Sequence, residues 1–160
     1  MASGPTMPVI DARSYELERM TEGVISRRFW AYLIDLVVIF FWICLICVAI
    51  FIFGIVTLGF GWLLFAVGLP LMAMTFVLYN AITIGGPAQA TVGMRMNGLK
   101  VVDASTGGRV SGLAAAVHAL LFYVASPTFL LWAGDILVGF ARSDRRFVRD
   151  LLTGILVVRA

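Results

Sequence analysis

Two long apolar stretches set the main constraint on this chain. Residues 29–53 and 60–84 contain a single charged side chain, Asp35, and each exceeds the roughly 20 apolar residues that cross a ~30 Å bilayer core. The whole chain is 61% hydrophobic and 13% charged. A soluble globular protein has about half apolar and about a quarter charged residues. The sequence therefore predicts an all-α integral membrane protein with two full transmembrane helices, at 29–53 and 60–84.

A third hydrophobic stretch, residues 113–140, is broken by Ser126-Pro127. If it crossed the membrane once, the arginines of segment 141–160 would lie opposite those of segment 85–112, against the positive-inside tendency. We therefore predict that 113–125 and 127–140 form a short helical hairpin or a re-entrant segment, which enters and leaves on one side. Segments 85–112 and 141–160 are then both cytoplasmic.

Two short β-branched runs, 99–102 and 155–158, are bounded by turn residues and predict strands. Isolated strands are stable only when paired, so both must lie on the same side of the membrane. This predicts a small cytoplasmic two-stranded β element. Residues 1–24 are polar and lack the apolar core of a secretory signal, which predicts a cytoplasmic N-terminal tail followed by a membrane domain at 25–160.

Asp35 is the first candidate functional residue, because an ionisable group inside a membrane costs at least a few kcal/mol unless it finds a partner or water. It follows Arg28 on the same predicted helix face. One interpretation is a structural clamp, with Asp35 bound to a cation such as Arg95. The other is a proton or cation relay, with Asp135 as a second carboxylate.

Three sequence blocks resemble the RDD family of small, mostly bacterial membrane proteins. They are Arg28, Ala31 and Asp35; Thr91-Val-Gly93-Met-Arg95 leading to Gly98-Leu-Lys100-Val-Val-Asp103; and Arg145-Arg146-Phe-Val-Arg149-Asp150-Leu-Leu-Thr-Gly154 with Val157-Val158. The resemblance covers about Gly23 to the C-terminus. It implies a multi-pass protein of the bacterial inner (plasma) membrane, for which we predict cytoplasmic termini. The family's role is largely unassigned, with transport suggested for some members.

This chain departs from the family pattern in two places. Met94 stands where the family usually carries lysine, and His118 stands where members often carry a basic residue early in the third stretch. The missing cation weakens any ion site built from the central block. In the closing block, Asp150 is predicted to hold the C-terminal strand to the basic layer, with Arg28 as a candidate partner.

Other reactive residues favour structural roles. Cys44 and Cys47 lie in the middle of a hydrophobic helix, where they are typical of small buried residues. His118 is the only histidine, which is insufficient for a metal site. With no phosphate-binding loop and no nucleophile and base pair, we expect no cofactor, no metal and no enzymatic activity. The basic residues are scattered and the net charge is +3, so we expect no nucleic-acid partner.

Two functions from different classes remain. The first is an accessory or structural subunit that associates with a larger membrane protein complex, for which a respiratory-chain complex is one conceivable host. Its partners are the lipid bilayer and other membrane subunits, or further copies of itself. The alternative is a small transporter or ion-coupled permeation protein that uses Asp35. Charge dependence discriminates them, because Asp35→Asn should abolish coupled transport but leave a scaffold assembled.

Overall fold

The computed structural model describes residues 9–160, with side chains from Tyr15 onward. Residues 1–8 of the predicted tail lie outside the described part. The rest of that tail is largely helical, as α1 (Val9–Thr21), a helix that we did not predict from the sequence. Thr21, at its end, is fully buried and donates its hydroxyl to Leu17 O at 2.7 Å. The α1 helix also packs against the C-terminal strand.

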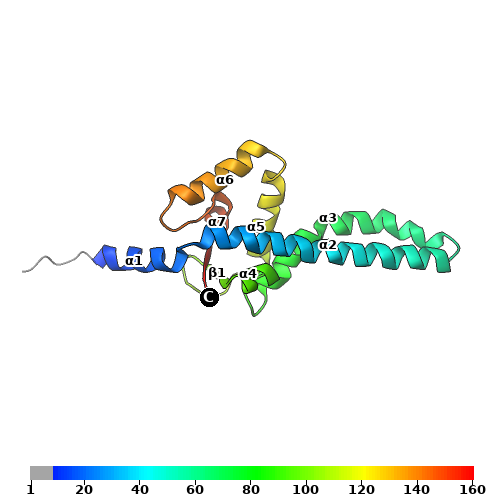
Figure 1. The fold of residues 1–160 in the computed structure, drawn as a ribbon, viewed down its shortest axis with the longest axis horizontal. Helices are drawn as coiled ribbons and strands as arrows, with labels where there is room; N and C mark the ends of the chain where they lie inside the picture. The colour runs from blue at the N-terminus through cyan, green and yellow to red at the C-terminus, as the bar shows by residue number, and fades with distance from the viewer. Residues whose placement is uncertain (1–8) are drawn as a thin grey trace, which may run out of the picture.

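Two long helices form a hairpin that extends away from the rest of the molecule (Figure 1). The first, α2 (Val24–Val56), begins five residues before the predicted boundary. After a turn at 57–59, the chain returns through the short 3-10 helix η1 (Phe60–Leu63) and α3 (Leu64–Gly85). Both arms are long and apolar enough to span a membrane. Pro70 lies inside α3.

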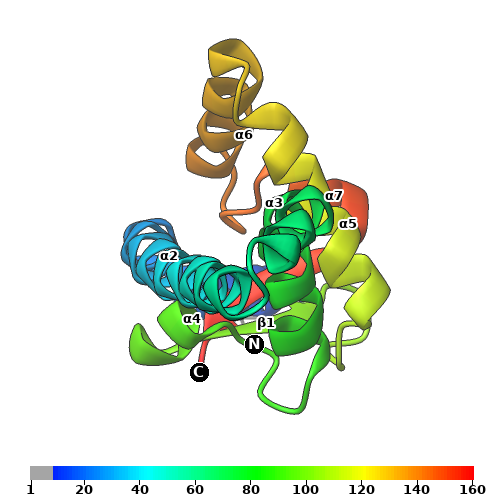
Figure 2. The same cartoon turned by 90° about the vertical axis from the view of Figure 1, so that its right-hand side faces the viewer.

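The third hydrophobic stretch forms two helices, α5 (Gly112–Ala125) and α6 (Phe129–Ala141). The α5 helix packs closely on α3, and an added Cβ at Gly85 would lie 2.5 Å from Gly112 Cα. The α6 helix stands apart from α2, as the view along the hairpin shows (Figure 2). Both outer ends of this pair lie at the base of the α2–α3 hairpin, because α5 starts beside Gly85 and α6 ends near the loop that contacts Thr21.

The predicted strands are present and paired. They are β1 (Leu99–Asp103) and β2 (Ile155–Arg159), which run antiparallel with Leu99 opposite Arg159. Two short helices precede them, α4 (Val92–Met96) before β1 and α7 (Val148–Thr153) before β2. The sheet therefore joins two segments of the chain that the hydrophobic helices separate.

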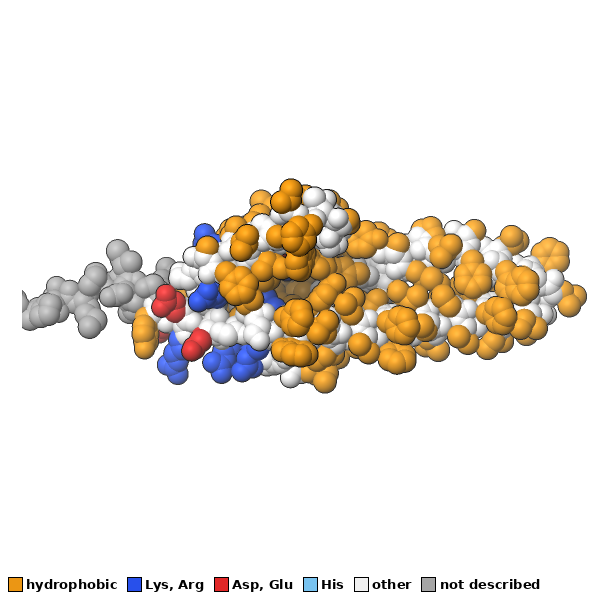
Figure 3. Space-filling view, turned by 45° about the horizontal axis from the view of Figure 1, so that its top comes forward, with side chains coloured by type: hydrophobic (Ala, Val, Ile, Leu, Met, Phe, Trp, Pro, Cys, Tyr) orange, Lys and Arg blue, Asp and Glu red, His pale blue; other side chains and the backbone are white. Residues whose placement is uncertain are grey.

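The hydrophobic core lies at the base of the hairpin, between α2, α3, α5 and the sheet. Its members are Val24, Ala31, Ile84, Leu99, Val101, Val110, Ala115, Ile155 and Val157. The rest of the protein covers little of the hairpin, since only 6% of the residues in the most apolar segment of its first arm are buried. Charged side chains gather at the opposite end of the molecule from the hairpin turn (Figure 3).

Candidate functional site: buried charges at the base of the hairpin

Asp35 is held by three hydrogen-bond donors from two other segments. Its Oδ1 accepts from the Tyr79 hydroxyl at 2.6 Å and from the Gly93 backbone N–H at 2.8 Å. Its Oδ2 accepts from the Thr91 hydroxyl at 2.6 Å. Thr91 is also the N-cap of α4, where the same oxygen accepts from Met94 N–H at 3.1 Å. The carboxylate therefore fastens α4 and α3 to α2.

The contact between α2 and α4 depends on a residue without a side chain. A Cβ placed on Gly93 would lie 2.0 Å from the Ala31 carbonyl oxygen and 2.9 Å from Cγ of Asp35. Only glycine allows the backbones to come this close. The small Ala31 side chain is buried at the same crossing. Thr91, Gly93, Ala31 and Asp35 thus form one tightly packed joint.

The interpretation that Arg95 neutralises Asp35 is wrong for this structure. Arg95 is exposed and forms no ion pair among residues 15–160. Asp35 instead uses neutral donors, because α4 places its N-terminal turn, and not its cation, against α2. Asp35 is also closer to the start of α2 than to its end, and the 33 residues of this helix extend about 50 Å. Since a bilayer core is about 30 Å thick, Asp35 is close to the polar end of the hairpin.

Asp150 is the centre of a second buried cluster. Its Oδ2 accepts from Arg28 Nη1 at 2.5 Å and from the Phe147 backbone N–H at 3.0 Å. Its Oδ1 lies 2.7 Å from Nε2 of His118. The Asp150 side chain is fully buried. One carboxylate thus joins α2, α5 and α7, and Arg28 is the partner that the sequence suggested.

The charged partners of Asp150 hold its pKa below the ordinary value. Burial alone would raise this pKa by penalising the charged form. The positive charge of Arg28 and the hydrogen bond from His118 outweigh that effect. Asp150 is therefore a permanent anion at neutral pH, suited to fixing helices in place.

Asp135 pairs with a residue of α7. One carboxylate oxygen accepts from the Arg149 backbone N–H at 3.1 Å, and the other from the Arg149 guanidinium. Both side chains are mostly buried. Asp135 therefore binds α6 to α7, next to the Asp150 cluster.

The two buried arginines, Arg28 and Arg149, stack on the same ring. The guanidinium carbons of both lie 4.7 Å from the centre of the Phe147 ring, and that of Arg149 is also 4.8 Å from the centre of Phe122. Gly139 leaves room for this ring, because an added Cβ would lie 2.2 Å from it. Three of their buried nitrogen atoms have no acceptor among the described residues: Nε and Nη2 of Arg28 and Nε of Arg149.

Beside these arginines lies a cavity of about 750 Å³, which we call the α2–α6 groove. Its wall is largely aromatic and aliphatic, and the acidic and basic side chains that line it are Arg28, Asp35, His118, Arg145 and Arg149. The surface is hollowed beside α6, close to Lys and Arg side chains (Figure 3). The groove exists because α6 stands away from α2. Its wall residues include Tyr32, Phe76, Phe122, Trp132, Ile136 and Phe140.

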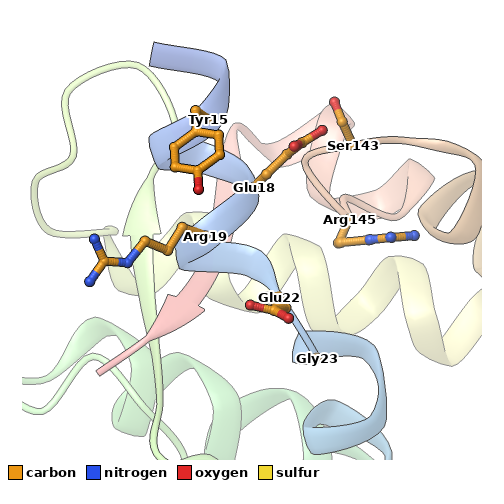
Figure 4. Close-up of a pocket in the computed structure, with 7 residues that line it drawn as sticks. All are labelled: Tyr15, Glu18, Arg19, Glu22, Gly23, Ser143 and Arg145. Carbon is orange, nitrogen blue, oxygen red and sulfur yellow. The ribbon is translucent and has the colours of Figure 1, made fainter. Parts of the chain in front are cut away.

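A smaller cavity of about 400 Å³ lies between α1 and the loop that follows α6. Figure 4 shows Tyr15, Glu18 and Arg19 from α1 and Glu22 from the turn that follows it on one side, with Ser143 and Arg145 on the other. It is a polar seam where α1 rests on the body of the protein. The charges that line it have both signs, which is typical of a solvated surface.

The remaining candidates from the sequence lie outside the clusters. Cys44 and Cys47 are free thiols, and Sγ of Cys47 lies 3.9 Å from Sδ of Met72. Among the described residues, no group of three or more His, Cys, Asp or Glu side chains is placed to hold a metal ion. The contacts that the structure shows in the two clusters are hydrogen bonds and ion pairs between helices.

Comparison with protein families agrees with this geometry. The model of the RDD family matches residues 23–154, from the start of α2 to the end of α7. The chain belongs to the RDD family. No curated protein and no solved structure matches it. With two membrane-spanning helices, it is a membrane protein of this family.

The three RDD blocks meet at the base of the hairpin. Arg28 of the first block contacts Asp150 of the third, and Asp35 of the first contacts Thr91 and Gly93 of the second. The two aspartate clusters are therefore the points where the RDD blocks are joined.

Sequence reasoning missed several members of these clusters. Tyr79 was not singled out, because a neutral donor inside an apolar helix carries no charge signal. His118 was interpreted as a core or interfacial residue, and the structure adds its contact with Asp150. Arg149 was not assigned to Asp135. The two residues are fourteen positions apart, on either side of the end of α6, so no local sequence pattern indicates that they pair.

Proposed function

We propose that this RDD protein is a non-catalytic accessory subunit that acts by associating with other proteins of a bacterial inner membrane. The observation that carries the proposal is the saturation of its buried carboxylates. Every carboxylate oxygen of Asp35, Asp135 and Asp150 accepts a hydrogen bond from another residue of the chain. Carboxylates that are bonded in this way hold helices together, and none of their oxygens is left free to bind a transported ion.

The uncovered hairpin supports association. Its first arm exposes large apolar side chains along most of its length, including Phe40, Phe41, Trp42 and Phe51. Within residues 9–160, no further helix of comparable length and hydrophobicity is present to pack against them. Lipid covers part of this surface, and a helix of a partner protein packs against the rest. A respiratory-chain complex is one host of the required kind.

The proposed topology follows from the base of the hairpin. The paired strands and both outer ends of α5–α6 lie there, together with most arginines. We place this base in the cytoplasm, in line with the positive-inside tendency, so that both termini are cytoplasmic. In this arrangement α5–α6 enters the membrane from the cytoplasmic side and returns to it.

Site-specific photo-crosslinking in native membranes tests the proposal. A crosslinking residue replaces Phe40 or Phe41, which are 62% and 66% exposed and point in different directions from α2. Leu58 in the hairpin turn, 92% exposed, is the control outside the hydrocarbon region. We expect a discrete heteromeric product from one face of α2, and a complex of the same partner on native gels.

Two results would overturn the proposal. One is a homo-oligomer that forms no heteromeric product at any α2 position. The other is ion-coupled flux in proteoliposomes that Asp35→Asn abolishes while the variant remains folded, because this would establish the alternative transport function. Cytoplasmic labelling of a cysteine introduced at Leu58 would contradict the topology alone.

A further inference from the structure

We propose that the α2–α6 groove binds an anionic phospholipid. Its phosphate accepts hydrogen bonds from Arg28 and Arg149, and an acyl chain lies along the aromatic wall. This proposal does not depend on the accessory role, because it concerns a lipid that binds this chain and not a partner protein. It rests on the unused N–H groups of the arginines and on the apolar character of the groove.

The two arginines carry more N–H donors than the described residues offer acceptors for them. A guanidinium carries five N–H donors. Arg28 is 91% buried, yet among the described residues only its Nη1 is bonded, to Asp150, and its Nε and Nη2 have no acceptor there. Nε of Arg149 lacks one as well. Buried donors without acceptors are rare in native proteins, so such a cluster indicates a missing acceptor.

The missing acceptor does not come from the surrounding carboxylates. Both oxygens of Asp150 and both of Asp135 already accept hydrogen bonds. His118 bonds Asp150. Asp35, which also lines the groove, already accepts hydrogen bonds at both of its carboxylate oxygens. The acceptor therefore comes from beyond the described residues. A phosphate matches best, because its oxygens accept several N–H bonds from arginine at once.

The rest of the groove identifies the molecule that carries the phosphate. Beyond the arginines, the wall is formed by Tyr32, Phe76, Phe122 and Trp132, with Ile136 on α6. A soluble anion gains nothing from such a wall, whereas an acyl chain buries its length there. Arg28 lies near the start of α2, at the end of the apolar span, where lipid headgroups lie. Basic pockets between membrane helices at this level suit anionic headgroups.

The ligand-bound arrangement needs a movement of the arginine side chains. In this structure the guanidinium of Arg28 lies against the Phe147 ring, and its free N–H groups are shielded. Both arginines line the groove. The proposal requires rotation about the flexible side-chain torsions to bring these N–H groups to the phosphate, with Nη1 still at Asp150. Phe147 remains as the stacking surface.

Native mass spectrometry of the full chain tests the site, after delipidation and addition of defined lipids. The probes are dioleoyl phosphatidylglycerol, dioleoyl phosphatidylcholine and inorganic phosphate. Ile136→Trp fills the groove without touching the arginines, and Leu137→Trp is its control, since Leu137 is 65% exposed on the same helix and does not line the groove. Arg149→Lys keeps the charge and removes Nε, with Arg142→Lys as the control on an exposed ion pair.

We expect one tightly bound phosphatidylglycerol per chain and weaker phosphatidylcholine binding. Ile136→Trp and Arg149→Lys should each lower phosphatidylglycerol binding about tenfold. The two control variants should bind as the unmodified protein does. Gel filtration and thermal unfolding verify that each variant is folded.

The proposal is overturned by equal binding of the two lipids, or by phosphatidylglycerol binding that a folded Ile136→Trp variant retains in full. Binding of inorganic phosphate that Ile136→Trp leaves unchanged, without lipid selectivity, would also overturn it in favour of a soluble anion. None of these outcomes bears on crosslinking from α2, so the accessory role stands or fails separately.

Discussion

Thr91 donates its hydroxyl proton to Asp35 at 2.6 Å, across 56 residues of sequence. The same hydroxyl oxygen accepts from Met94 N–H and so begins α4. A single side chain therefore caps one helix and anchors it to another. This relationship places Asp35 among the structural groups of the protein.

Removal of the Asp35 carboxylate is expected to destabilise the fold in a graded way. Asp35→Ala leaves Tyr79, Thr91 and Gly93 without their acceptor and should cost about 3 kcal/mol, because several buried donors become unsatisfied. Asp35→Asn retains one acceptor oxygen and should cost about 1 kcal/mol. Thermal unfolding in detergent measures the difference.

The control for this prediction is Asp103→Asn. Asp103 is partly exposed, and hydrogen bonds from Ser105 and Thr106 lower its pKa to about 2. Hydrogen exchange at residues 92–96 should rise in Asp35→Ala and not in Asp103→Asn. Equal unfolding temperatures for Asp35→Ala and the unmodified protein would contradict the anchoring role.

Breaking the Arg28–Asp150 pair from one side is expected to cost about 3–5 kcal/mol, because the remaining charge stays buried. The double variant Arg28→Met with Asp150→Leu should cost less than the sum of its two single variants. A double-mutant cycle in chemical denaturant measures this coupling. Asp144→Asn is the comparison, since its pair with Arg142 is exposed and is worth at most about 1 kcal/mol. Additive costs would show that the two residues do not interact.

Acid should destabilise the protein through Asp150. Its pKa is lower in the folded state, because Arg28 and His118 outweigh the effect of burial. The resulting stability is present above the unfolded pKa of about 3.9 and is lost as the pH falls through the folded value. Asp150 should therefore leave the unfolding temperature unchanged between pH 7 and pH 5, and its protonation should lower that temperature steeply below about pH 4. In Asp150→Asn the low-pH decline should be shallower, and an identical profile would refute the assignment.

Glycine to alanine substitutions at two positions are expected to have opposite effects. Gly93→Ala places a Cβ within 2.0 Å of the Ala31 carbonyl oxygen, so we expect a loss of at least about 1–3 kcal/mol. Gly134→Ala in α6 meets nothing within 4 Å and should stabilise that helix by about 0.5–1 kcal/mol. Unfolding free energies of both variants test the pair, and destabilisation of similar size would refute the packing argument.

The sequence predicted the features that a pattern of neighbouring residues encodes. Apolar length and the break at Ser126-Pro127 indicate the helices, and β-branched runs between turn residues indicate the paired strands. Arg28 and Asp150 were linked as a candidate pair, since a buried charge requires an opposite one. Opposite charge was a poor guide for Asp35, which is satisfied by neutral donors.

Other features arise only from tertiary contacts. The helix α1 was missed because its polar composition resembles a tail, although residues 9–22 contain no Gly or Pro. The α2–α6 groove results from how far α6 stands from α2, which no residue spacing encodes. The pairing of Asp135 with Arg149 likewise depends on the angle between α6 and α7.

The Arg28–Asp150 contact also imposes an order on synthesis. The two residues are 122 positions apart, and the ribosome makes the arginine first. While α2 and α3 are being inserted, Arg28 has no permanent counter-ion, and β1 has no strand to pair with. The base of the hairpin therefore closes last, when α7 and β2 emerge and fasten both ends of the membrane domain at once.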